Sequence, residues 1–175
     1  MHNVEGAEGR SPRTRCPIRS LAPLLLVMLA TPAAAQSPPA TDRGGVTVAA
    51  GVRAALDSFI VDFNNLDSAR FTARWAEGAS AVLPFPDTPH RLDGRDAVLA
   101  RFMSYFAQMR RERSGPPFLF MVLHHVRIDT LGDDAALVAY EFSAAERVHR
   151  RSLVMVRDDA GAWKVLQMHG SSGMP

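Results

Sequence analysis

Apolar residues follow helical spacing in two stretches of this chain. In residues 52–63 they occupy one helical face, and Asn64 and Asn65 are suited to end the helix because Asn tolerates left-handed backbone geometry. In residues 98–109 a second apolar face leads into a polar run that begins at Arg110. We therefore predict one helix near the start of the folded region and another near its middle.

A shorter helix is predicted between these two. Asp67 is a suitable N-cap, and Leu66 and Phe71 occupy the positions of a hydrophobic staple. Gly78 is the next residue that favours a helix end, so we predict that the helix extends to it. Capping explains Asp67 without any catalytic role.

The second half of the chain changes to strand spacing. Residues 118–129, 135–144, 147–157 and 163–171 are strand candidates separated by turn sequences, and residues 79–83 form a shorter one. Helices followed by a meander of strands indicate an α+β domain. We predict three N-terminal helices packed on a strongly curved antiparallel sheet, which together form a cone with an interior pocket.

The start of the first long strand, residues 118–123, is apolar on both faces. Such a strand is unusual in a sheet with one solvated side. We infer that the outer face is also covered, and we predict that a second copy of the chain covers it in a homodimer.

The N-terminal segment has the pattern of a targeting sequence. Arginines precede the apolar run LAPLLLVMLA, which is too short for a stable bilayer anchor, and small residues up to Ala35 offer a cleavage site. We predict a secretory signal peptide over residues 1–35, a flexible linker over residues 36–46 and one domain over residues 47–175. The expected product is exported, periplasmic or secreted, and has no membrane anchor after signal cleavage.

Charge and cysteine content narrow the function classes. Residues 1–35 carry four of the 20 basic and two of the 18 acidic side chains, which leaves 16 of each. A formally neutral remainder gives no support for nucleic-acid binding, because that activity needs a concentrated positive surface. Cys16, the sole cysteine, lies in the predicted signal peptide, so cysteine nucleophiles and thiolate metal sites are not expected in the mature chain.

Four phrases carry a likeness to a known family: LDSARFTARWAEGA, RLDGRDAVLARF, VRIDTLGDDAALVAYEF and the ending WKVLQMHGSS. Over residues 52–172 the chain resembles the SnoaL-like branch of the nuclear transport factor 2-like superfamily. Members commonly end on Trp, an aliphatic residue, His, His and Ser, each two positions apart. Those positions are held here by Trp163, Val165, Gln167, His169 and Ser171, so Gln167 departs from the commoner His. The resemblance implies a cone with an interior pocket and usually a dimer.

The same resemblance fixes function poorly, because members include isomerases, cyclases, dehydratases, transport adaptors and oligomerisation domains. Among the ketosteroid isomerases, the catalytic carboxylate corresponds to Leu83 and the tyrosine of the first helix to Phe59. Both functional groups are missing here. Steroid isomerisation by that mechanism is therefore not expected.

Polar residues on the predicted inward faces are candidate ligand contacts. Strict alternation in the last strand puts Gln167 and His169 on the same face as Trp163, and His124 is in phase with Val122 on the first long strand. We predict a polar patch of Gln167, His169 and His124 in an otherwise apolar pocket. A bulge would shift this alternation by one residue, and histidines that only satisfy hydrogen bonds across strands are the competing interpretation.

Aromatic side chains near the predicted mouth complete the candidate site. Trp75, Phe85 and Tyr105 are predicted ligand contacts, although packing in the core would explain them equally well. If the protein catalyses proton transfer, Tyr105 is the candidate donor and His169 or His124 the candidate base.

Three functions are compatible with these residues. The leading hypothesis is an exported protein that binds a small, largely apolar molecule in its cone, with catalysis left open. The second is a proton-transfer enzyme of the isomerase, cyclase or dehydratase type, and the third is a non-enzymatic dimerisation or interaction module. We predict no cofactor and no metal, because His124, His149 and His169, which could supply imidazole ligands, lack short ligand spacing.

Overall fold

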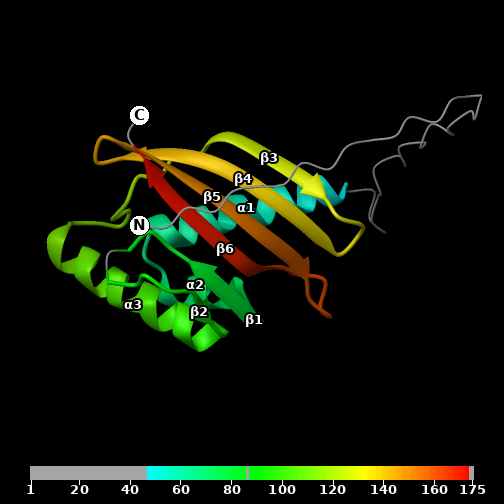
Figure 1. The fold of residues 1–175 in the computed structure, drawn as a ribbon, viewed down its shortest axis with the longest axis horizontal. Helices are drawn as coiled ribbons and strands as arrows, with labels where there is room; N and C mark the ends of the chain where they lie inside the picture. The colour runs from blue at the N-terminus through cyan, green and yellow to red at the C-terminus, as the bar shows by residue number, and fades with distance from the viewer. Residues whose placement is uncertain (1–46, 86, 174–175) are drawn as a thin grey trace, which may run out of the picture. The chain divides into compact units, whose positions relative to one another are not determined.

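The computed structural model describes residues 47–85 and 87–173. Its helices are α1 (Val48–Asn64), α2 (Ser68–Ala73) and α3 (Arg95–Glu112), and its strands are β1 (Trp75–Val82), β2 (Leu92–Asp93), β3 (His124–Thr130), β4 (Ala135–Ala144), β5 (Arg147–Arg157) and β6 (Trp163–Gly173). In Figure 1, α1 runs along one face of the sheet, and α3 lies next to β1 and β2. The predicted signal peptide and linker lie outside the described residues.

The strands form one open sheet in the order β2-β1-β6-β5-β4-β3. β1 runs parallel to β6, and every other neighbouring pair is antiparallel. The predicted all-antiparallel sheet is therefore wrong at one pair, because β1 and β6 are far apart in sequence and no hairpin turn fixes their relative direction. The predicted α+β class, with helices packed on the sheet, is confirmed.

Helix α1 supplies much of the core. Its N-cap is Thr47, whose Oγ1 accepts a hydrogen bond from the Ala50 N–H at 3.2 Å. Leu56 and Phe59 on its inner face are buried against the sheet. The helix ends where the Asn pair predicts. Among the described residues, no helix combines the length and apolar character needed to cross a membrane.

The end of α2 differs from the prediction. The Asp67 cap is present, because its side chain accepts a hydrogen bond from the Arg70 N–H at 3.0 Å. The helix stops at Ala73 rather than Gly78, and the Val165 N–H donates to the Arg74 carbonyl at 2.8 Å. The chain has then entered the sheet, so strand pairing replaces helical bonding well before the glycine.

Residues 118–123 are not a strand, although they were predicted to begin one. Asn64, at the end of α1, takes their hydrogen bonds: its carbonyl accepts from the N–H groups of Phe118 and Leu119. Its side chain donates to the Met121 carbonyl at 3.1 Å and accepts from the Met121 N–H at 3.0 Å. The segment is therefore tied to a helix, and strand pairing begins only at β3.

A two-residue turn sets the register between β4 and β5. Ala145 and Glu146 both have positive φ values, 50° and 59°. Turns of this kind match the right-handed twist of the strands that they join. The resulting register puts Phe142 directly opposite His149.

Strand β6 contains a bulge at Leu166. Val165 and Gln167 lie opposite consecutive residues of β5, so Leu166 between them has no residue opposite. One extra residue reverses the facing of every later side chain. Val165 therefore shares its inward face with Met168, which is 3% exposed, and with Ser172.

Candidate functional site

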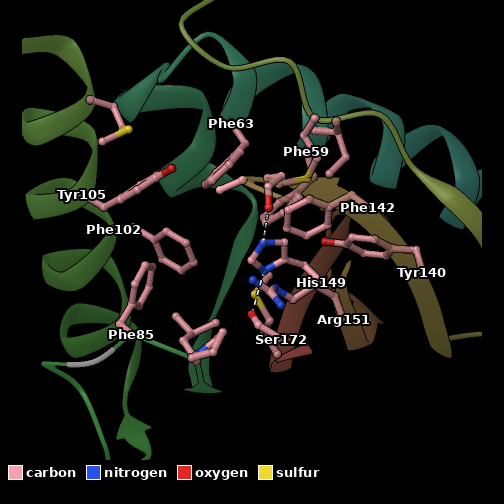
Figure 2. Close-up of a pocket in the computed structure, with 18 of the residues that line it drawn as sticks. Phe59, Phe63, Phe85, Phe102, Tyr105, Tyr140, Phe142, His149, Arg151 and Ser172 are labelled. Carbon is pink, nitrogen blue, oxygen red and sulfur yellow. Dashed lines mark hydrogen bonds between the residues drawn. The ribbon is translucent and has the colours of Figure 1, made fainter. Parts of the chain in front are cut away.

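A cavity of about 420 Å³ lies between the helices and the sheet. Its walls come from α1, α3, the loop after β1, and strands β4, β5 and β6. The lining residues are mostly aromatic or aliphatic: Phe59, Ile60, Phe63, Leu83, Pro84, Phe85, Phe102, Tyr105, Met109, Arg113, Met121, Tyr140, Phe142, Ala144, Ala145, His149, Arg151, Met168 and Ser172. Figure 2 shows Phe85, Phe102 and Tyr105 on one side and His149, Arg151 and Ser172 on the other.

The helical side of the cavity is aromatic. The Phe63 and Tyr105 rings are stacked with centroids 6.0 Å apart, and the Phe85 ring centroid lies 5.8 Å from that of Tyr105. The Arg101 guanidinium lies 3.8 Å from the Phe85 ring centroid and pairs with Asp87 at 2.9 Å. These contacts hold the loop after β1 against α3 and present apolar ring surface to the cavity.

The sheet side centres on His149, which makes hydrogen bonds through both ring nitrogens. Nε2 lies 3.2 Å from the Ala144 carbonyl oxygen, and Nδ1 lies 2.7 Å from Ser172 Oγ. A carbonyl only accepts, so Nε2 carries the proton, and Nδ1 of the neutral ring accepts from the Ser172 hydroxyl. The ring also stacks on Phe142, with centroids 4.8 Å apart and planes 11° from parallel. The imidazole is thus held in one tautomer and one orientation.

Arg151 lies beside this pair, on the same face of β5. Its Nη1 donates to the carbonyl oxygens of Arg150 at 2.8 Å and Ser171 at 3.2 Å, and its Cζ lies 5.1 Å from the Phe142 ring centroid. Gly170 makes room for it, because a Cβ at position 170 would lie 2.8 Å from Nη1. The guanidinium therefore lies against the sheet in the space that the missing side chain of Gly170 leaves open.

Burial sets the protonation states on the sheet side. It lowers the pKa of His149 below its ordinary value of 6.5; the bond to Ala144 opposes this, and the positive charges of Arg151 and Arg147 add to it. The imidazole is neutral at pH 7. Burial also raises the pKa of the Tyr140 phenol and lowers that of the Arg151 guanidinium, which nevertheless stays charged at neutral pH.

The charges around the cavity have one sign. Arg113, at the end of α3, and Arg151 both line it, and among the described lining residues there is no Asp or Glu. Neither the helical wall nor the sheet side therefore offers a carboxylate to act as a general base. Among the described lining residues, the side chain that can take up a proton near neutral pH is His149, through Nδ1, which now accepts a hydrogen bond from Ser172 Oγ.

Gln167 and His169 do not face the cavity. Both follow the bulge at Leu166, and His169 is exposed, whereas Met168 and Ser172 line the cavity. The predicted inward facing of Gln167 and His169 is therefore wrong, because the alternation shifts by one residue at the bulge. With their present orientation, neither side chain reaches the cavity interior.

His124 is also outside the cavity. It is exposed at the start of the edge strand β3, opposite Glu141, and the neighbouring His125 places Nδ1 3.0 Å from Glu141 Oε2. The predicted polar patch of three residues is thus not assembled. Within residues 47–173, residue 86 apart, no three His, Cys, Asp or Glu side chains are grouped to hold a metal ion.

The three aromatic candidates separate into two groups. Trp75 is 2% exposed and packs on Phe59 and Phe71 in the core, so its expected place on the cavity wall is corrected. Phe85 and Tyr105 do line the cavity. Burial raises the pKa of the Tyr105 phenol, which keeps its proton at neutral pH. Ligand contact by these two residues stays a prediction.

As a candidate site residue, His149 was considered from the sequence only as a possible metal ligand, and Arg151 was not singled out. The signal that could have identified them is alternation along β5, since both are in phase with Leu153 and Met155, which are 0% and 1% exposed. That phase already assigns both to the buried face. Ser172 could be identified only once the bulge was known.

The positions that correspond to the isomerase groups are themselves in the cavity. Leu83 and Phe59 line it and are 6% and 3% exposed. The apolar side chains at both positions leave the cavity without the carboxylate and the phenol of that mechanism.

Several solved structures resemble this one. A cystatin-like fold protein from Burkholderia xenovorans LB400 has 21% identity and a TM-score of 0.56, over 73% of this chain and 93% of that chain. A ketosteroid isomerase-like protein from Erwinia carotovora atroseptica SCRI1043 has 16% identity and a TM-score of 0.59, over 73% and 97%. An NTF2-like protein of unknown function from Pseudomonas putida KT2440 has 17% identity and a TM-score of 0.59, over 70% and 84%. At these identities the likeness concerns the fold, which is that of the NTF2-like superfamily.

The family assignment is narrower than the superfamily. The family model of the SnoaL-like domain matches residues 52–175. The chain therefore belongs to the SnoaL-like domain family. No curated protein matches it.

Proposed function

We propose that this protein binds a small, largely apolar molecule in the cavity between its helices and its sheet. The observation that carries the proposal is the cavity itself: about 420 Å³, lined mainly by aromatic and aliphatic side chains, with His149, Arg151 and Ser172 gathered on one side. Ligand pockets are typically about 300–1,000 Å³, mostly apolar, with a few polar groups that orient the ligand. Gln167, His169, His124 and Trp75 have no part in this binding site.

Native mass spectrometry of the protein purified from an exporting host tests the proposal. We expect a mass increment that denaturation releases as a discrete small molecule. The matched variant is Ala144→Leu, which adds bulk at the cavity lining, and its control is Ala160→Leu in the exposed turn between β5 and β6. Loss of the increment in the first variant alone supports the proposal. A protein that takes up no small molecule, or an increment that both variants retain equally, contradicts it.

A second candidate function is proton transfer on the bound molecule, with His149 as the base. It is favoured by one observation: the His149 imidazole is neutral and positioned at the cavity by Ala144 and Ser172. The test is exchange of the acidic C–H protons of 2-tetralone, a small apolar ketone, for deuterium in D₂O. Catalysed exchange that His149→Gln abolishes supports this function. An exchange rate equal to that of buffer alone removes it.

We also propose that the protein is a homodimer formed through the outer face of the sheet. Leu137 on that face is 38% exposed, and Val122 and Phe120 beside β3 are 63% and 76% exposed. Leu137→Glu should shift the native mass from dimer to monomer. Val61→Glu on α1, at a residue that is 54% exposed, should not.

Export is proposed on the sequence pattern of residues 1–35. Expression of the full chain in a bacterial host with a periplasm should yield a mature N-terminus at Gln36. N-terminal sequencing of the periplasmic fraction reads this out, and a full-length chain retained in the cytoplasm would contradict it.

A further inference from the structure

We propose that the sheet side of the cavity is an anion subsite, in which Arg151 and Ser172 hold the carboxylate of a small aryl or alkyl carboxylic acid. This inference rests on the proposed binding function and names its ligand class. The structural basis is the juxtaposition of a fitted guanidinium with a hydroxyl at one end of an apolar cavity (Figure 2).

Within the described part of the chain, Arg151 has no carboxylate partner of the kind that several other arginines have. Arg74 pairs with Asp62, Arg101 with Asp87 and Arg150 with Glu141. Among the described residues, by contrast, Arg151 forms no ion pair with a carboxylate, and its hydrogen bonds go to two backbone carbonyls. Moving a cation out of water is costly unless an anion compensates it. The cavity beside Arg151 is where that anion can come from.

The donors around this point suit a carboxylate. A guanidinium has five N–H groups in a planar fork, and both hydrogen bonds of Arg151 to described residues use Nη1. Nε and Nη2 are left to bind a carboxylate in the bidentate manner that Arg favours. Ser172 Oγ, beside His149, adds a hydroxyl donor on the same side.

The apolar part of the cavity indicates what the ligand carries besides its carboxylate. Phe63, Phe85 and Phe102 lie across from Arg151 and offer ring faces to an aromatic or alkyl body (Figure 2). With about 420 Å³ available, a bicyclic aromatic acid fits. No described residue of the lining is acidic, so nothing there repels the anion.

Anion binding is coupled to a proton at His149. When Ser172 donates to a carboxylate, it no longer donates to His149 Nδ1, and a protonated ring can then donate to Ser172 Oγ instead. The groups that face the imidazole are Arg147 and Arg151 on β5, Ser172 on β6, and Tyr140 on β4, with the phenol of Tyr105 and the cation of Arg113 across the cavity. Both β5 cations disfavour the charged ring, and an anion offsets them. Acid ligands should therefore bind more tightly as the pH falls from 7.5 to 6, until the ligand itself is protonated.

Calorimetric titration with 2-naphthoate and its neutral isostere 2-naphthamide tests the subsite. We expect the purified protein to bind the acid about tenfold or more tightly than the amide, since a charge-assisted bidentate pair replaces a neutral contact. Arg151→Met should lower the affinity for the acid until it is about equal to the affinity for the amide. Arg150→Gln is the matched control, because Arg150 lies on the outer face against Glu141, and it should keep the preference.

The outcomes separate the inference from the function on which it rests. If neither compound binds, the proposed cavity binding is itself contradicted. If both bind with equal affinity, or if Arg151→Met keeps the preference, the anion subsite is overturned while cavity binding stands. Circular dichroism checks folding, and Arg151→Lys, which keeps the charge but not the fork, should lose most of the preference even if Arg151→Met does not fold.

Discussion

The two sides of the cavity are built from different residues and do different work. The helical side presents four Phe rings, carried by α1, α3 and the loop after β1, whereas the sheet side presents His149, Arg151 and Ser172. Phe59 and Phe102 belong to the buried core, and Phe63 and Phe85 are partly buried and pack against it, so these rings stabilise the fold. The polar groups contribute little apolar burial, and in the proposed function they orient the ligand. The helical side should therefore govern the stability of the fold, and the sheet side should govern selectivity between ligands.

The largest effect on stability is expected from a substitution on the helical side of the cavity. Phe102 is 4% exposed and its ring centroid lies 5.0 Å from that of Phe71, so Phe102→Ala should lower the free energy of unfolding by about 3–5 kcal/mol. Urea denaturation measures this. Val61→Ala on α1, at a side chain that is 54% exposed and outside the proposed dimer face, is the control and should change stability by less than about 1 kcal/mol. Equal losses in both variants would break the distinction between wall and surface.

A change next to Arg151 should affect selectivity more than stability. Gly170→Ala places a Cβ 2.8 Å from the present position of Arg151 Nη1, which is too close, so the flexible guanidinium has to move. We expect the preference for 2-naphthoate over 2-naphthamide to fall roughly fivefold, a loss of about 1 kcal/mol, with a similar or smaller change in unfolding free energy. An unchanged preference would mean that the present position of the guanidinium is not the one that binds.

Removing the charge of Arg151 should leave the fold intact. Arg151 is partly buried, and replacing such a charged group with an apolar one of similar length is often neutral, because the desolvation penalty disappears with the charge. Arg151→Met should therefore change the unfolding free energy by no more than about 1 kcal/mol, although two hydrogen bonds to carbonyls are lost. Thermal denaturation reads this out. A loss of stability as large as that of Phe102→Ala would mean that Arg151, like the Phe rings of the helical side, stabilises the fold.

The smallest effect is a pH dependence on the sheet side. Because burial lowers the pKa of His149 in the folded protein, the unfolded chain binds a proton at this residue first as the pH falls through 6.5. The contribution of the neutral His149 side chain to the free energy of unfolding is therefore fully present above pH 6.5 and is lost as the pH falls below it. Between pH 7.5 and 5.5, His149→Gln should lose less stability than the wild type, as measured by urea midpoints. The opposite ordering would mean that the folded imidazole is protonated more readily than the unfolded one.

The regular elements could be predicted from sequence because local pattern and packing agree. β4 and β5 have the predicted bounds, and α1 ends where the Asn pair predicts. The errors occur where a distant segment takes over the hydrogen bonds. Asn64 forms hydrogen bonds with residues 118–121, so this segment does not pair as a strand. The hydrogen bond from the Val165 N–H to the Arg74 carbonyl marks the point at which the chain has left α2 for the sheet.

The site was harder to predict than the fold, for a related reason. Phe85 and Tyr105 could be placed near the cavity because helices and loops cover the predicted mouth. The facing of Gln167 and His169 depended on strict alternation, and no local signal identifies Leu166 as the extra residue in β6. The assignment of β6 side chains to the cavity therefore required the pairing of β6 with β5.

The bulge at Leu166 also decides where a new catalytic group could be engineered into this scaffold. A histidine at position 167 would lie on the outer face of the sheet, outside the cavity. Met168 and Leu83 line the chamber itself, so Leu83→Asp or Met168→His would install a titratable group there. Leu166, the unpaired residue in β6, thus determines which β6 positions face the cavity and could carry a catalytic group, and which face outward.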